Sequence, residues 1–258
     1  CTNQYRLLVK PKIPVFLLLF HIILLVVSAS IGTAKPRLNR VALVIGNSTY
    51  LHISNLRTPS SDSSAIAAQF QRLGYQTILL QKLTRKQLLI ALAELQISAV
   101  NSDQVVVYYA GHGMQHNGES YLIPTDALAS NELMTAHLIP MRVVIRAISD
   151  KPRQKLVFFD ACRDGVLLGK PASGKNSNSW AHAGLFILYS TQPGTTASDG
   201  MNYLSPFAHA MTQALKKPPM PIEEFAKRVR LDVIRETNGA QVPWSQSSLL
   251  RPAILSVE

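Results

Sequence analysis

Two stretches of the sequence decide the fold: residues 105–113 read VVVYYAGHG, and residues 155–164 read KLVFFDACRD. Each begins as a run of β-branched, aromatic and other apolar residues. Runs that are apolar on both faces are typical of parallel strands buried within a sheet. The sequence therefore predicts two buried strands, each followed directly by residues that can carry chemistry.

The rest of the chain alternates between strand-like and helix-like segments. Further short apolar runs, which predict strands, occupy 40–46, 76–80 and 185–190. Helix-length segments occupy 62–73, 84–97, 139–149, 206–215 and 222–237, with Asp62 and Thr84 as candidate N-caps. This alternation predicts one α/β domain with a mostly parallel central sheet of about six strands and helices on both faces. Open sheets of this class place ligands at the carboxyl ends of the strands.

Composition excludes several classes of protein. The 258 residues are 47% hydrophobic and 16% charged, which is not a disordered composition. Two cysteines cannot support a disulfide-rich scaffold. The net charge of +11 raises a nucleic acid or a membrane surface as a partner, but the basic residues form no dense run interleaved with aromatics. We therefore expect no nucleic-acid partner.

The N-terminal segment accounts for part of that charge. Arg6, Lys10 and Lys12 precede the apolar run 15–27, and small residues follow it up to Ala34. A 13-residue helix spans about 20 Å, less than a hydrocarbon core of about 30 Å, so an export signal is favoured over a membrane anchor within residues 1–34. The expected location is periplasmic or extracellular, with tethering to a membrane as the alternative. Residues 35–258 then form the domain, with a charge of +8.

His112 and Cys162 come directly after the two deciding strands, and Cys162 is the only cysteine beyond residue 34. A cysteine nucleophile needs a nearby base, and imidazole is suited to that role near neutral pH. The glycines on either side of His112 let the backbone turn sharply and approach a substrate closely. Taken alone, a single cysteine is more often an inert core residue. The pair at two strand ends favours catalysis.

Several motifs together resemble a known family. They are YYAGHG at 108–113, YLIPTDA at 121–127, FFDACRD at 158–164 and YSTQPG at 189–194, followed by Ser-Pro-Phe at 205–207. The chain resembles the caspase-like cysteine peptidases, and within them the metacaspases and their bacterial relatives, over nearly all of residues 38–255. The caspase signature Gln-Ala-Cys is replaced by Asp-Ala-Cys here.

The resemblance implies a role for each residue of these motifs. Cys162 matches the nucleophile of a cysteine endopeptidase, and His112 matches the general base that also protonates the leaving amine. The backbone amides of Gly113 and Cys162 match the oxyanion hole. No third catalytic residue is evident, and the family does not require one. The alternative is a catalytically idle binding scaffold with the same fold.

Acidic residues near the nucleophile bear on specificity. Asp160 lies two residues before Cys162, and Asp62 stands where metacaspases carry a second pocket carboxylate. Two carboxylates in one cleft are best satisfied by a guanidinium or ammonium group, so we expect cleavage after Arg or Lys, not after Asp. The partners are then proteins or peptides with basic residues. Ser190 and Asp199, after a later strand, are further expected substrate contacts. As alternatives, Asp62 is an ordinary N-cap and Asp160 a structural carboxylate.

Metal binding is not expected. His112 and His116 have a spacing that binds zinc on a helix, but GHGM follows a strand and contains two glycines. Metacaspases are commonly activated by calcium, yet the acidic residues between His112 and Cys162 form no dense cluster. No cofactor is therefore expected, and calcium activation is doubtful.

The segment 163–179 is rich in Gly, Ser, Asn and Lys and predicts a loop. Arg163, Lys170 and Lys175 are basic residues in it that a peptidase of this specificity could cut in itself. An uncleaved, solvated loop is the alternative.

Overall fold

A six-stranded sheet forms the centre of the computed structural model, which describes residues 38–128, 134–148, 153–163, 183–197 and 203–255. The strand order is β2-β1-β3-β7-β8-β9. The first five strands of that order are parallel, and β9 is antiparallel to β8. The bounds are β1 Arg40–Gly46, β2 Gln76–Gln81, β3 Gln104–Ala110, β7 Gln154–Asp160, β8 Leu185–Tyr189 and β9 Trp244–Ser247. The predicted sheet of about six strands is confirmed.

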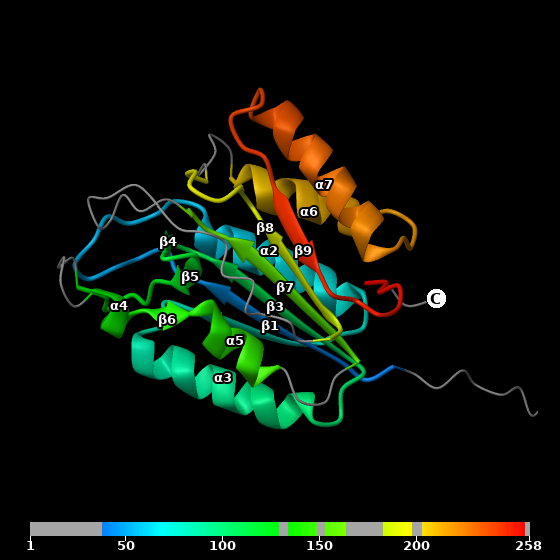
Figure 1. Ribbon diagram of the computed structural model, residues 1–258, viewed down its shortest axis with the longest axis horizontal. Coiled ribbons are helices and arrows are strands. Elements are labelled where there is room, and N and C mark those ends of the chain that lie inside the picture. Colours follow the sequence, from blue (N-terminus) through cyan, green and yellow to red (C-terminus); the bar gives the residue numbers. More distant parts are fainter. Residues whose placement is uncertain (1–37, 129–133, 149–152, 164–182, 198–202, 256–258) are drawn as a thin grey trace, which may run out of the picture. The chain divides into compact units, whose positions relative to one another are not determined.

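Helices cover both faces of this sheet (Figure 1). One face carries α2 (Pro59–Arg72), α6 (Pro206–Leu215) and α7 (Ile222–Glu236), and the other carries α3 (Arg85–Ala99) and α5 (Met141–Ala147). Side chains alternate along each strand: Ala42 and Val44 of β1 pack toward the first group, Val41 and Leu43 toward the second. Because the central strands are buried on both faces, they read as continuous apolar runs.

A second, three-stranded sheet follows directly after His112. It consists of β4 (Gly113–His116), β5 (Glu119–Leu122) and β6 (Ile139–Pro140), with the short helix α4 (Met134–His137) before β6. Asn117 and Gly118 join β4 to β5 and both have positive φ, 49° and 79°. An Asn-Gly pair is the usual signal of a tight hairpin. We did not predict this hairpin, although it holds one side of the site.

Two expected helix starts differ from the structure. Helix α2 begins at Pro59 with Thr58 as its N-cap residue, so Asp62 lies one turn inside the helix instead of capping it. Proline at the first helical position has the backbone angle that starts a helix. The segment expected as a helix from residue 139 begins with β6, and α5 starts only at Met141.

The chain divides into two compact units, Cys1–Arg37 and Leu38–Glu258, and the described residues all lie in the second. Among the described residues, no helix is both long and apolar enough to cross a membrane. The predicted export signal and anchor lie outside the described residues.

Candidate active site

The carboxyl end of β3 positions His112. The amide of His112 donates to the Tyr50 hydroxyl at 2.8 Å, and the Tyr109 hydroxyl donates to the His112 carbonyl at 2.8 Å. The rings of Tyr50 and His112 lie 4.7 Å apart. The backbone and ring of this histidine are therefore held by groups from β3 and from the loop that follows β1.

The imidazole itself has a main-chain partner. His112 Nε2 lies 2.8 Å from the carbonyl oxygen of Ser54. Because a carbonyl only accepts hydrogen bonds, Nε2 carries the proton and Nδ1 is the basic nitrogen of the neutral ring. Ser54 was not predicted as a functional residue, since a backbone carbonyl leaves no signature in a sequence.

Gly113 begins β4 and packs closely against the segment of the nucleophile. A β-carbon added there would lie 2.6 Å from Cβ of Ala161 and 2.8 Å from Cζ of Phe159. In an antiparallel pair, alternate residues bond the partner strand, and here the His112 carbonyl accepts from the Ile123 amide. The Gly113 amide consequently points away from β5. Only glycine fits this approach without displacing its neighbours.

The carboxyl end of β7 positions Cys162, which is half-buried and forms no disulfide among the described residues. Its Sγ lies 3.7 Å from the carbonyl oxygen of Ala197. The next residue, Arg163, is 2% exposed, and its guanidinium lies 3.9 Å above the ring of Tyr189. Burial lowers the pKa of Arg163, against the smaller raising effect of Tyr189. This packing holds the backbone of the residue that directly follows the nucleophile.

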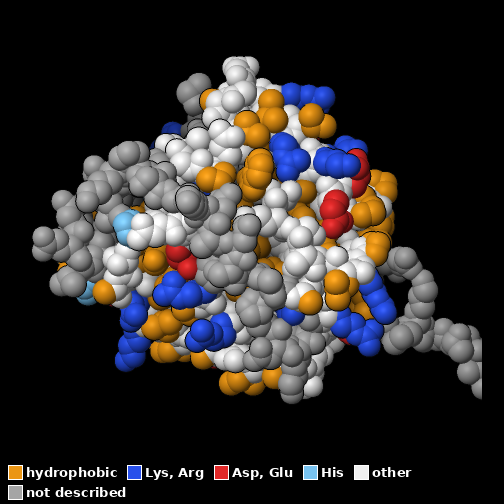
Figure 2. Space-filling model, viewed as in Figure 1, with side chains coloured by type: hydrophobic (Ala, Val, Ile, Leu, Met, Phe, Trp, Pro, Cys, Tyr) orange, Lys and Arg blue, Asp and Glu red, His pale blue; other side chains and the backbone are white. Residues whose placement is uncertain are grey.

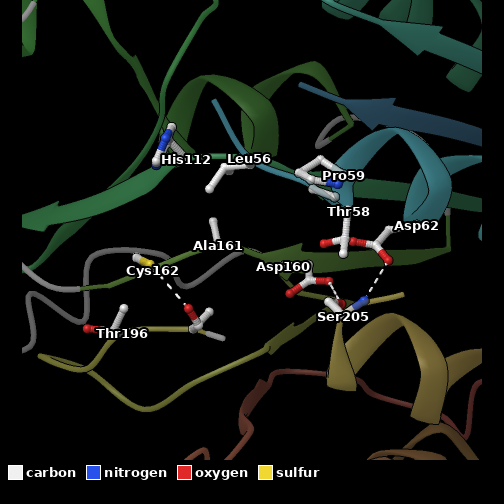
Figure 3. Close-up of a pocket in the computed structure, with 13 residues that line it drawn as sticks. Leu56, Thr58, Pro59, Asp62, His112, Asp160, Ala161, Cys162, Thr196 and Ser205 are labelled. Carbon is white, nitrogen blue, oxygen red and sulfur yellow. Dashed lines mark hydrogen bonds between the residues drawn. The ribbon is translucent and has the colours of Figure 1, made fainter. Parts of the chain in front are cut away.

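His112 and Cys162 line one pocket of about 220 Å³ (Figure 3). In Figure 3 they lie at one end of the pocket, with Leu56 and Ala161 between them and the carboxylates of Asp62 and Asp160. The pocket thus brings together the four residues that the sequence analysis singled out as the dyad and the acidic pair. It is lined by Leu56, Thr58, Pro59, Asp62, Ala110, Gly111, His112, Asp160, Ala161, Cys162, Thr196, Ala197 and Ser205.

The two carboxylates are buried and share a partner in Ser205. Asp62 is 1% exposed and accepts a hydrogen bond from the Ser205 amide at 2.8 Å. Asp160 is 7% exposed and accepts from the Ser205 hydroxyl at 2.7 Å and from the Tyr108 hydroxyl at 3.1 Å. Burial, together with the charges of both carboxylates, raises the pKa of Tyr108. The Tyr108 phenol therefore stays neutral and donates a hydrogen bond to Asp160.

Ser205 was not predicted as a site residue. Its hydroxyl also accepts from the Ala208 amide at 3.0 Å and so caps α6. The Ser-Pro pair at a helix start was the available signal for the cap. Its bonds to two carboxylates depend on the packing of α6 beside α2 and could not be read locally.

The remaining predictions concern other substrate contacts and the positions of self-cleavage. Ser190 is fully buried, its hydroxyl lies 3.4 Å from the Ala161 carbonyl, and it is not among the residues that line the pocket; Thr196 and Ala197 are. Asp199, Lys170 and Lys175 lie outside the described residues. Arg163 is buried with its guanidinium over the Tyr189 ring, which is inconsistent with self-cleavage after it in the folded protein.

The described residues offer no obvious metal site. No group of three or more His, Cys, Asp or Glu side chains within the described ranges could hold a metal ion. His116 ends the strand β4, so it does not share a helix face with His112.

The structure is thus an α/β domain in which a cysteine and a histidine follow neighbouring strands and line one pocket. The family model described as "Caspase domain" matches residues 39–254, and the chain belongs to this family. The resemblance seen in the motifs is thereby confirmed at the level of a caspase-like domain.

Two curated relatives match part of the chain. They are the mouse "Mucosa-associated lymphoid tissue lymphoma translocation protein 1 homolog" and the human "Mucosa-associated lymphoid tissue lymphoma translocation protein 1". Each is 27% identical over 126 residues, which is 48% of this chain. The aligned part covers 15% of each relative, so the similarity concerns one region of those proteins.

Proposed function

We propose that this protein is a cysteine endopeptidase that cleaves peptide bonds after Arg or Lys. The observation that carries the proposal is that Cys162 and His112 line the same pocket as the buried carboxylates of Asp62 and Asp160. Membership of the caspase domain family supports the cysteine peptidase class. The carboxylates support the preference for a basic residue.

The proposed chemistry starts at the imidazole. His112 Nδ1 accepts the thiol proton, since Nε2 is bonded to the Ser54 carbonyl. The thiolate of Cys162 attacks the carbonyl carbon of the scissile bond and forms a C–S bond. The amides of Gly113 and Cys162 stabilise the oxyanion. The imidazolium then protonates the leaving amine as the C–N bond breaks, which leaves a thioester.

The second half of the reaction uses the same residues in reverse. His112 takes a proton from a water molecule whose oxygen attacks the thioester carbonyl. Collapse of the second tetrahedral intermediate breaks the C–S bond and releases the carboxylic acid. The proton on His112 returns to the sulfur, and the dyad is restored.

The proposed pocket for the basic residue lies beside the dyad. Asp62 and Asp160 already accept hydrogen bonds from Ser205 and Tyr108, which hold the carboxylate oxygens in place. A guanidinium entering this pocket would meet two oriented anions and form charge-assisted hydrogen bonds, each worth about 1.5–3 kcal/mol. An Asp side chain would meet like charge and be repelled.

The dyad is tested by hydrolysis of fluorogenic peptides that end in Arg, Lys or Asp. We expect turnover of the Arg and Lys peptides, and a fall of at least about 10³-fold in kcat for Cys162→Ala and His112→Ala. Cys1→Ala removes the other cysteine and should leave the rate unchanged. Folded protein with no turnover that depends on Cys162 would favour the idle scaffold instead.

The pocket is tested by Asp160→Asn. We expect kcat/KM for the Arg peptide to fall about 10- to 100-fold, because one charge-assisted bond is lost. Asp232→Asn removes a partly exposed carboxylate on α7 whose one ion pair among the described residues is with Arg235, and serves as the matched control. A preference of the wild-type enzyme for the Asp peptide would rule out the role given to the carboxylates.

A further inference from the structure

The outer face of helix α3 carries exposed apolar side chains beside the polar Gln87, Glu94 and Gln96. Its inner face buries Leu88, Ala91, Leu92, Leu95 and Ala99. On the outer face Ile90 is 47% exposed and Ile97 75%, and Val100, which follows the helix, is 42% exposed. Exposed apolar side chains that gather on one surface are typical of a contact site. The outer face of α3 is therefore a candidate contact surface.

The chain enters the domain beside this face. The Asn39 amide donates to Asp103 at 3.0 Å, and the Asn39 side chain donates to the Asn101 carbonyl at 2.7 Å, just after α3 ends. Leu38, the first described residue, is 49% exposed. In Figure 1 the start of β1 and the end of α3 lie at the same end of the domain. Leu38, where the described chain begins, thus lies at the end of α3 that carries Ile97 and Val100.

Cations border the apolar stripe. Arg85 and Lys86 begin α3 and Arg146 lies on α5, and all three are exposed and form no ion pair among the described residues. Arg85, Lys86, Leu89, Ile90, Ala93 and Asp126 line a shallow hollow of about 520 Å³. Figure 2 shows Lys and Arg side chains interleaved with hydrophobic ones along the lower margin, over α3 and α5.

Acidic side chains on the same face are few. Glu94 is the one acid within α3. Asp126 accepts a hydrogen bond from the Arg85 amide at 2.8 Å, which uses its carboxylate to cap the helix. Glu119 accepts from Arg142 at 3.0 Å. The hydrogen bond leaves the charge of Asp126 in place, so the three cations Arg85, Lys86 and Arg146 exceed the two acids Glu94 and Asp126 by one charge.

We propose that the outer face of α3, with Leu38 and Arg146, rests on a lipid bilayer that contains anionic lipids. Apolar side chains flanked by Lys and Arg match the boundary between headgroups and acyl chains, and each cation near an anionic surface adds about 1 kcal/mol. In the tethered alternative of the sequence analysis, the apolar run 15–27 stays in the chain and is followed by only ten residues before Leu38, which keeps this end of the domain near the bilayer. None of the residues that line the active-site pocket belongs to α3 or α5, so substrates still reach it.

A second copy of the chain is a poorer occupant of this face. In a two-fold symmetric contact the same patch meets itself. Arg85, Lys86 and Arg146 would then face an equally basic patch, which costs free energy. An anionic surface satisfies the same cations.

The test measures which face of the domain meets lipid, with the full chain bound to vesicles of phosphatidylcholine and phosphatidylglycerol that carry brominated acyl chains. Bromine quenches tryptophan at short range. Ile97→Trp places a fluorophore on α3, and Leu231→Trp places one on α7, where Leu231 is 53% exposed. We expect the quenching added over wild type to be at least about twofold greater for Ile97→Trp. Equal quenching at the two positions would overturn the proposal.

A second experiment reverses the charge of the three cations. Combining Arg85→Glu, Lys86→Glu and Arg146→Glu should remove at least about half of the extra quenching on vesicles with phosphatidylglycerol. The control combines Lys216→Glu, Lys217→Glu and Arg228→Glu, which make the same change in net charge outside α3 and α5 and should leave the quenching unchanged. An equal loss in both triple variants would contradict a specific face.

Sedimentation without lipid tests whether a second copy of the chain binds the outer face of α3. We expect the wild type and Ile97→Glu to sediment alike. A dimer that Ile97→Glu converts to a monomer would assign the face to a second copy and overturn the proposal. None of these readouts uses peptidase activity, so the proposed function and this inference can fail independently.

Discussion

The space around Gly113 leaves no room for a side chain. A methyl group there would lie within 3.0 Å of Ala161, Phe159 and the Cys162 carbonyl. Steric fit thus explains the glycine after His112 without any appeal to backbone flexibility. The amide that we assign to the oxyanion hole depends on the same close approach.

The change Gly113→Ala should therefore damage catalysis. We expect β4 to move away from Ala161 and kcat to fall about 10²- to 10³-fold, the usual effect of losing one oxyanion donor. Fluorogenic assays together with thermal unfolding separate catalysis from folding. In the control Gly239→Ala the added carbon meets nothing within 4 Å, and the positive φ of 83° costs only stability. Wild-type kcat in Gly113→Ala would refute the assignment of this amide.

At the scale of elements, local sequence determines most boundaries. Helix α6 begins and ends as predicted, and α3 begins after the predicted cap, with Thr84 and Gln87 forming a capping box. The small sheet was not predicted because its strands are only two to four residues long, too short for a periodic pattern. Strand β9 was missed because it is an exposed edge with no buried run.

The capping box gives a stability prediction. Thr84→Ala removes the side chain that accepts from the Gln87 amide, so we expect a loss of about 1 kcal/mol and a fall of about 2–4 °C in Tm. Activity should not change, since α3 does not line the pocket. Ser98→Ala, in the same helix, removes a hydroxyl that donates back to the Glu94 carbonyl and should change stability by less than about 0.5 kcal/mol. Equal losses in the two variants would show that the capping box contributes no more to stability than the Ser98 hydroxyl does.

At the scale of the whole molecule, four buried tyrosines link stability to pH. Burial raises the pKa of Tyr75, Tyr108, Tyr109 and Tyr189 above the ordinary value of 10.0. A raised pKa in the folded state means that these phenols stay neutral while those of the unfolded chain ionise. Their contribution to stability is complete below about pH 10 and is lost as the pH rises through the folded-state values.

We therefore expect the free energy of unfolding to fall above about pH 10, by about 1.4 kcal/mol per pH unit for each such tyrosine. Urea unfolding between about pH 8 and pH 11, with phenolate absorbance recorded alongside, measures this slope. Tyr189→Phe keeps the ring beneath Arg163 and should reduce the slope by the share of one group. A free energy that is constant over this range would contradict the prediction.

The sequence by itself determined the parallel sheet, the helices on both faces and the positions of His112 and Cys162 at strand ends. It could do so because buried runs and caps are local signals. Only the tertiary structure decided that Ser54 orients the imidazole, that Ser205 joins Asp62 to Asp160, and that Arg163 is buried over Tyr189 instead of exposed for cleavage. These contacts join segments far apart in the chain, and two of them run through backbone groups that every residue possesses.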